Sequence, residues 1–171
     1  MKTLIKIIVV LFISLQVVEP ATAQTKKQVR DAAKVAEVKD LLDAKTFTFQ
    51  ARYMYPMGGG QRYLNTDYDV RVTKDSVIVF LPYFGVAYSG AGYNTNEDNG
   101  IKFTSTKFDY KSEVKKNGNQ YIVIKPTDSR TTNQLVFNIS PNGSTDLSVI
   151  SNNRQRIRFD GYLKDKPKTK K

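Results

Sequence analysis

The chain has 171 residues, and its 27 Lys and Arg against 16 Asp and Glu give a formal charge of +11 at pH 7. It contains no cysteine, histidine or tryptophan. Disulfides, thiolate nucleophiles, Cys/His zinc sites, iron–sulfur clusters and catalysis by a histidine base are therefore excluded, and any chemistry would rest on carboxylates, Lys, Tyr or Ser.

Residues 1–23 have the pattern of a secretory signal peptide. Lys2 and Lys6 give a positive start, an apolar run follows, and Ala21-Thr22-Ala23 has the small–x–small spacing that signal peptidase accepts. A membrane anchor is the alternative, but the apolar run contains two polar residues and is short for a span of about 20 residues. We therefore expect an exported protein, located in the periplasm or outside the cell of a Gram-negative bacterium, with no membrane span after cleavage.

Residues 24–45 are predicted to form one helix. The segment is rich in Ala, Lys, Glu and Leu and contains no Gly or Pro, a composition with high helix propensity. Val35, Val38 and Leu42 recur at helical spacing. Because this apolar stripe is narrow, we expect the helix to lie on a surface.

Residues 46–163 are predicted to form one all-β domain. Phe47, Phe49, Tyr53 and Tyr55 alternate with polar residues, which is the period of a half-buried strand. Turn signals such as Asn117-Gly118 recur about every 8–12 residues and favour an antiparallel eight-stranded barrel or a strongly curved sheet. The remaining residues, 164–171, hold five lysines and one aspartate, net +4, and are expected to be a disordered basic tail.

Four stretches carry a family resemblance: 47–52 with 56–58, then 81–89, 100–105 and 153–161. The most specific is Leu-Pro-Tyr-Phe-Gly-Val-Ala-Tyr, which begins at Leu81. On these stretches the chain resembles the bacterial domain-of-unknown-function family numbered 4251. The resemblance implies a small exported protein of a Gram-negative bacterium with a lipocalin-like β-barrel and no assigned activity. In that family an arginine commonly stands where this chain has Val86.

The loop from residue 83 to residue 100 is the main candidate ligand site. Loops of this length inside a compact domain are usually functional or disordered. Aromatic rings beside glycines can stack on a sugar, a lipid or another flat ligand while the backbone approaches closely. The alternative is that the rings close one end of the barrel as part of its core. The candidate ligand-binding residues are Tyr83, Phe84, Gly85, Tyr88 and Tyr93.

Two weaker patterns are better explained as solvated surface than as functional sites. Residues 94–100 are rich in oxygen ligands, but an EF-hand loop starting at Asn94 would have Asn99 where it needs Gly and Ser105 where it needs Glu, so we expect a solvated turn and no metal site. Asp67 and Asp69 could form the carboxylate pair of a glycoside hydrolase. Arg71 and Thr73 share their predicted face, which favours a solvated charged face.

Three functions remain open. The first is a non-enzymatic binding protein for a small apolar or sugar-like ligand in the barrel mouth, which a barrel packed solid with Phe and Tyr would contradict. The second is a cell-envelope interaction or structural module whose basic helix and tail contact an anionic partner. The third, a hydrolase using Asp or Glu, is disfavoured because the sequence reveals no carboxylate pair in an apolar context. No cofactor is expected, and no basic element of the RNA-binding kind is found.

Overall fold

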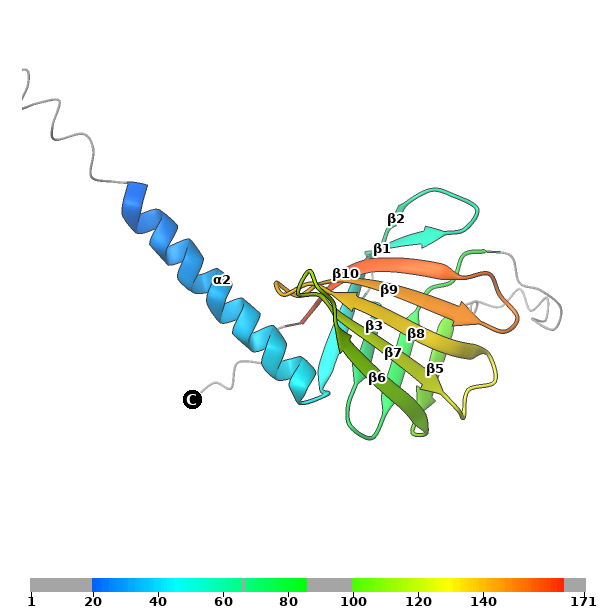
Figure 1. The fold of residues 1–171 in the computed structure, drawn as a ribbon. Coiled ribbons are helices and arrows are strands. Elements are labelled where there is room, and N and C mark those ends of the chain that lie inside the picture. Colours follow the sequence, from blue (N-terminus) through cyan, green and yellow to red (C-terminus); the bar gives the residue numbers. More distant parts are fainter. Residues whose placement is uncertain (1–19, 66, 86–99, 165–171) are drawn as a thin grey trace, which may run out of the picture. The chain divides into compact units, whose positions relative to one another are not determined.

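The structure is a computed structural model that describes residues 20–65, 67–85 and 100–164 (Figure 1). The chain divides into two compact units, Met1–Lys34 and Val35–Lys171, and the second contains all the strands. Most of the predicted signal peptide and nearly all of the predicted tail lie outside the described residues, so both stay predictions. No helix among the described residues is long and apolar enough to cross a membrane.

The helix α2 (Pro20–Asp43) begins four residues before the predicted start and ends two before the predicted end. Its end has a physical cause in Lys45, which adopts a left-handed conformation with φ of 51°. The N–H of Lys45 donates to the Leu42 carbonyl and the N–H of Thr46 donates to the Leu41 carbonyl, both at 3.0 Å. These two bonds form a Schellman motif, which stops the helix and turns the chain into the first strand.

The strands form a nearly closed antiparallel barrel. Nine of them follow the order β5-β4-β3-β1-β10-β9-β8-β7-β6, and β2 pairs with β1 beside this path. The two end strands, β5 and β6, are separated by only Thr106 and Lys107, so the chain itself joins the two edges. The strands are β1 (Phe47–Pro56), β2 (Arg62–Tyr63), β3 (Asp69–Val72), β4 (Val77–Leu81), β5 (Ile101–Ser105), β6 (Phe108–Val114), β7 (Gln120–Pro126), β8 (Thr132–Ile139), β9 (Ser144–Ser151) and β10 (Ile157–Leu163).

The predicted fold class, an antiparallel β-barrel with one N-terminal helix, is confirmed. The sequence predicts an eight-stranded barrel, and nine strands lie along the barrel path, with β2 paired beside it.

Side chains fill the barrel interior. Phe49, Phe137 and Phe159 are fully buried, and the Phe137 ring meets those of Phe47 and Phe49 edge-on at centroid distances of 5.6 and 6.1 Å. Aliphatic side chains from the facing strands occupy the space around these rings, as alternation along each strand requires. These described side chains count against the ligand site expected in the barrel mouth, although residues 86–99 of its loop lie outside the described residues. The other fully buried large side chains are Met54, Leu81, Ile122, Ile124, Leu135, Ile139, Leu147, Ile157 and Leu163.

β1 and β10 approach each other closely in the middle of the sheet. The register between these strands shifts between Ala51 and Tyr53, which marks a β-bulge, and Gly161 lies opposite Ala51. A Cβ on residue 161 would stand 1.9 Å from the carbonyl oxygen of Gln50. Only glycine lets the two backbones approach this closely at the bulge.

Candidate functional site

Tyr83, the first predicted ligand-binding residue, belongs to the core. Its side chain is 8% exposed and packs with the buried apolar cluster. The hydroxyl donates a hydrogen bond to the Gln155 carbonyl at 3.3 Å, and the Arg154 guanidinium lies 4.9 Å from the ring centroid. Arg154 also donates to the Gly100 carbonyl at 3.3 Å. Tyr83 therefore closes the end of the barrel, which is the alternative that the sequence left open.

The neighbouring candidates Phe84 and Gly85 differ in their surroundings. Phe84 is 47% exposed, with the Arg62 guanidinium 4.6 Å from its ring centroid. Gly85 has a steric role, because a Cβ there would stand 2.7 Å from the Tyr83 hydroxyl. Tyr88 and Tyr93 lie outside the described residues. The structure thus brings Tyr83 and Gly85 together and places an arginine against each described ring, and the ligand role of the loop stays a prediction.

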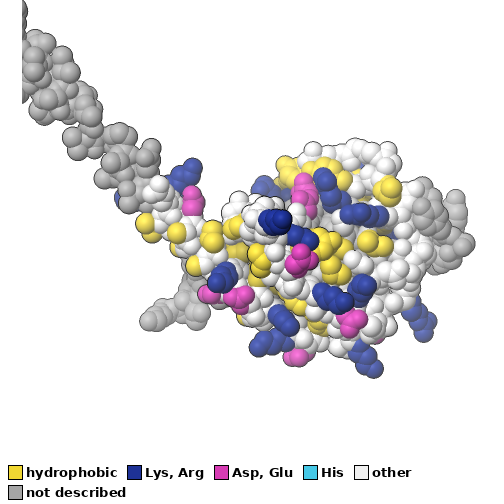
Figure 2. Space-filling view, viewed as in Figure 1, with side chains coloured by type: hydrophobic (Ala, Val, Ile, Leu, Met, Phe, Trp, Pro, Cys, Tyr) yellow, Lys and Arg dark blue, Asp and Glu magenta, His cyan; other side chains and the backbone are white. Residues whose placement is uncertain are grey.

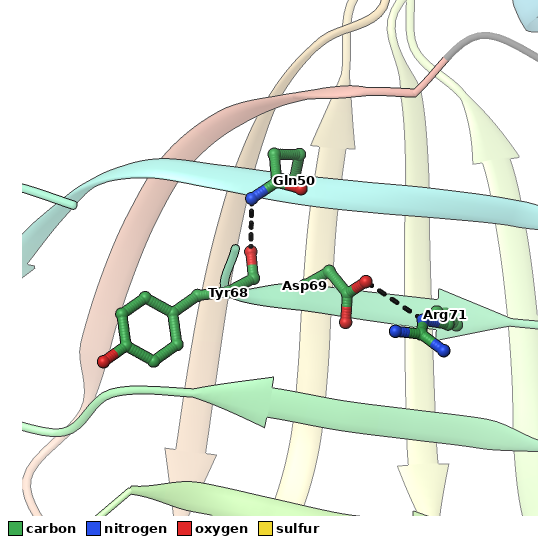
Figure 3. Close-up of polar contacts among 4 residues, drawn as sticks. All are labelled: Gln50, Tyr68, Asp69 and Arg71. Atoms are coloured by element: carbon green, nitrogen blue, oxygen red, sulfur yellow. Dashed lines mark hydrogen bonds and ion pairs between the residues drawn. The ribbon is translucent and has the colours of Figure 1, made fainter. Parts of the chain in front are cut away.

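The expected solvated pair of Asp67 and Asp69 does not form. Asp69 is 4% exposed and accepts a hydrogen bond from Arg71 Nε at 3.0 Å (Figure 3). Asp67, in contrast, is exposed and precedes β3. Beside them, Gln50 of β1 lies directly opposite Asp69 and donates from Nε2 to the Tyr68 carbonyl at 3.1 Å. Alternation along residues 67–73 predicted a solvated face, but alternation along one strand does not show that β1 lies beside it and helps to bury Asp69.

The sequence analysis also missed a carboxylate pair. Asp146 of β9 and Asp160 of β10 are directly opposite each other, and Arg158 Nε lies 3.7 Å from one oxygen of each. Partial burial, and then the hydrogen bond and charge of Asp160, raise the pKa of Asp146 to about 6. The sequence predicted no carboxylate pair in an apolar context; this pair is partly exposed, and the sequence does not reveal it because the two residues meet only through the β9–β10 register.

An apolar groove lies at the helix end of the barrel. Its volume is about 400 Å³, and one wall is the last turns of α2 while the other is the β6–β7 and β8–β9 turns. Val35 and Val114, both with exposed side chains, line this groove, one from each wall. We call this feature the helix-end groove. Its lining consists of Val35, Val38, Lys39, Leu42, Asp43, Val114, Gly118, Gln120, Ile139, Ser140 and Pro141.

Local sequence explains why both walls stay in place. The Schellman motif ends α2 just after Leu42 and Asp43. Gly118 and Gly143 have φ of 81° and 88°, which tight turns require and which glycine adopts without strain. The helical spacing of Val35, Val38 and Leu42 predicted the apolar stripe that forms the α2 wall of the groove. The second wall comes from turns far along the chain, so no local signal could have predicted the groove.

A second, more polar pocket of about 410 Å³ lies beside β6 and the β3–β4 turn. Phe108 and Tyr110 line it from β6, Lys74 lines it from the turn, and Lys45 Nζ stands 5.1 Å from the Tyr110 ring centroid. Burial raises the pKa of Tyr110 to about 12, so its hydroxyl keeps its proton at neutral pH. This pocket can offer ammonium and hydroxyl donors, whereas the helix-end groove offers mainly apolar contact.

Charge does not single out another site. On the face shown in Figure 2, lysine and arginine side chains are spread among acidic and uncharged ones and do not gather into one patch. Within the described ranges, no three Asp or Glu side chains lie close enough together to hold a metal ion. The helix-end groove is therefore the candidate functional site on the described part of the chain.

Comparisons with known proteins identify a family and a fold. A family model described as "Domain of unknown function (DUF4251)" matches residues 29–163. The crystal structure of a DUF4251 family protein from Bacteroides eggerthii DSM 20697 is similar, with a TM-score of 0.59 and 17% identity over 81% of this chain and 91% of that chain. At this identity the likeness supports the fold alone. Among curated proteins, none matches.

Proposed function

Because the chain belongs to the DUF4251 family of domains of unknown function, we propose a function from its geometry: it is a non-enzymatic protein that binds a small apolar ligand in the helix-end groove. The observation that carries the proposal is the groove itself. Its volume of about 400 Å³ falls in the range of small-molecule sites, about 300–1,000 Å³. Among the described residues, large apolar side chains such as Phe49, Phe137 and Phe159 are fully buried inside the barrel, which favours a site on its outside.

The lining of the groove supports this class of ligand. Its walls carry valine, leucine, isoleucine and proline side chains, and four polar side chains join them: Lys39, Asp43, Gln120 and Ser140. An apolar body against the walls with a small polar end near these polar residues satisfies both kinds of surface. Burial of apolar surface supplies the affinity, at about 25 cal/mol per Å² before the costs of association are subtracted.

The charged side chains of the lining support binding without catalysis. Lys39 and Asp43 carry opposite charges one helical turn apart. The lining holds one carboxylate, that of Asp43, and not the pair that glycoside hydrolysis uses. We further propose that the protein acts outside the cytoplasm, on the basis of the signal-peptide pattern in residues 1–23.

The test uses a neutral fluorescent probe, N-phenyl-1-naphthylamine, and its displacement from the purified protein by 1-dodecanol. We expect saturable binding that Val114→Glu weakens at least tenfold, because this change places a charge in the groove. Val114 is 66% exposed, so the substitution leaves the core intact. Val29→Glu is the matched control, since Val29 is 64% exposed and does not line the groove. Equal affinities for the two variants would refute the proposal.

A further inference from the structure

The outer face of β2, β1, β10 and β9 carries four aligned side chains. Tyr63 lies directly opposite Tyr53, Tyr53 opposite Asp160, and Asp160 opposite Asp146. Residues that lie opposite each other in neighbouring strands point to the same face, and neighbouring strands are about 4.8 Å apart. These four residues therefore form one continuous strip across four strands that lie side by side in Figure 1. We call it the tyrosine–carboxylate row.

One end of the row is an aromatic platform. The rings of Tyr53 and Tyr63 meet at a centroid distance of 5.4 Å with an interplanar angle of 64°. Tyr63 is 62% exposed, so a large part of its surface is open to a ligand. One step along the strands, Tyr55 lies opposite Arg158, whose guanidinium is 4.3 Å from the Tyr55 ring centroid. The platform is therefore amphipathic, with ring faces beside a hydrogen-bond donor.

The other end of the row is a shared carboxylate site. Arg158 Nε lies 3.7 Å from one oxygen of Asp146 and from Oδ1 of Asp160. Within the described residues, Asp160 Oδ1 is buried and accepts no hydrogen bond of normal geometry. The side chain of Asp146 is 51% exposed. Asp146 thus presents acceptor oxygens to the surface, the Asp160 side chain is 36% exposed beside it, and the guanidinium of Arg158 supplies donors.

The tyrosine rings, carboxylates and guanidinium of this face favour one class of partner over others. The centre of a protein interface is depleted in Asp, yet two aspartates occupy the centre of this face. Phosphate groups and nucleic acids are repelled by the two carboxylates, and Arg158 between them disfavours a metal cation. A neutral saccharide suits every element, because its C–H faces stack on tyrosine rings and its hydroxyl groups donate to carboxylates and accept from arginine.

We propose that the tyrosine–carboxylate row binds a neutral saccharide, at a site separate from the helix-end groove. The row is on the outer face of the barrel and shares no residue with the groove lining. The two proposals can therefore fail independently. A saccharide lying across the strands would stack on Tyr63 and Tyr53 and direct hydroxyl groups to Asp160 and Asp146.

Biolayer interferometry on immobilised neutral oligosaccharides tests this site, with the hexamers of cellulose, xylan, mannan and amylose as probes and oligogalacturonate as the anionic comparison. We expect at least one neutral hexamer to bind with a Kd of about 1 mM or tighter. Tyr63→Ala should weaken that binding at least tenfold, and Asp146→Asn should weaken it as well. Oligogalacturonate should bind more weakly than the neutral hexamer.

The control variant is Tyr121→Ala, because Tyr121 is a half-buried tyrosine of β7 and lies outside the row. It should leave the affinity unchanged. The proposal is overturned if none of the four neutral hexamers binds, if Tyr63→Ala binds as tightly as the unaltered protein, or if Tyr121→Ala is the variant that loses binding. Tyr63 belongs to a two-residue strand and is mostly exposed, so its truncation does not unfold the barrel.

Discussion

The Asp128 carboxylate accepts the backbone N–H of Thr106 at 2.9 Å. The same carboxylate accepts the N–H of Lys107 at 3.2 Å and a hydrogen bond from the Ser105 hydroxyl. Asp128 follows β7, whereas the three donors lie where β5 ends and the chain bends into β6. One side chain therefore fixes the bend that joins the two edges of the sheet, and it satisfies backbone N–H groups that no strand pairs.

Asp128→Ala should lower the melting temperature, because it leaves the Thr106 and Lys107 N–H groups without their acceptor. The Ser105 hydroxyl, followed by the Thr106 N–H, holds the pKa of Asp128 below its ordinary value. A carboxylate with a lowered pKa stabilises the fold above its ordinary pKa, and this stabilisation is lost as the pH falls through the folded value. The variant should therefore differ from the unaltered protein at pH 7 and converge with it in acid.

Thermal unfolding followed by circular dichroism at pH 7 and pH 2.5 measures this difference. Asp109→Ala is the control, since Asp109 is an exposed aspartate of β6 that does not contact the bend. If both variants melt at the same temperature at pH 7, the bond network around Asp128 contributes nothing to stability.

Gly161→Ala should destabilise the barrel by at least about 2 kcal/mol, because the added Cβ would overlap the Gln50 carbonyl oxygen and force β1 away from β10. Gly58→Ala is the control, since a Cβ on residue 58 meets no atom within 4 Å. Urea unfolding measures both variants. A Gly161→Ala protein as stable as the Gly58→Ala protein would show that the two strands do not need this close approach.

Lys45→Gly should be more stable than Lys45→Ala by about 1 kcal/mol. Residue 45 has φ of 51°, which glycine adopts without the cost that a Cβ imposes. Both substitutions remove the contact between Lys45 and the Tyr110 ring, so that loss cancels in the comparison. Helix propensity predicts the opposite order, since alanine is favoured inside helices. Urea unfolding of the two variants decides between the two effects.

Local sequence patterns predicted the strands and turns, whereas the candidate sites depend on the register between strands. The alternation from Phe47 to Tyr55 predicted β1, and Asn117-Gly118 predicted the β6–β7 hairpin, because strand period and turn chemistry act over a few residues. The meeting of Asp146 with Asp160 depends on which residues of two strands stand opposite each other. A single stretch of sequence does not determine such a pairing, because register depends on the whole sheet. The burial of Asp69 and the second wall of the helix-end groove depend on the whole sheet in the same way.

Asp146→Asn should stabilise the protein at pH 7 and leave its stability unchanged near pH 3.5. Burial and Asp160 raise the pKa of Asp146 to about 6. For an acid whose pKa is raised by folding, the favourable contribution is complete below the ordinary pKa and is lost as the pH rises through the folded pKa. The unaltered protein should therefore lose stability between about pH 4 and pH 6, the interval between the ordinary pKa and the value in the fold.

The asparagine variant carries no charge at residue 146 and lacks this loss. Because the Asp146 side chain is 51% exposed, solvent screens the effect, and the expected gain at pH 7 is on the order of 1 kcal/mol. Urea unfolding at pH 3.5 and pH 7 measures it, with Asp109→Asn as an exposed control. A gain of equal size at both pH values would mean that the asparagine acts through packing or hydrogen bonding, and that repulsion between Asp146 and Asp160 does not limit the stability of the barrel.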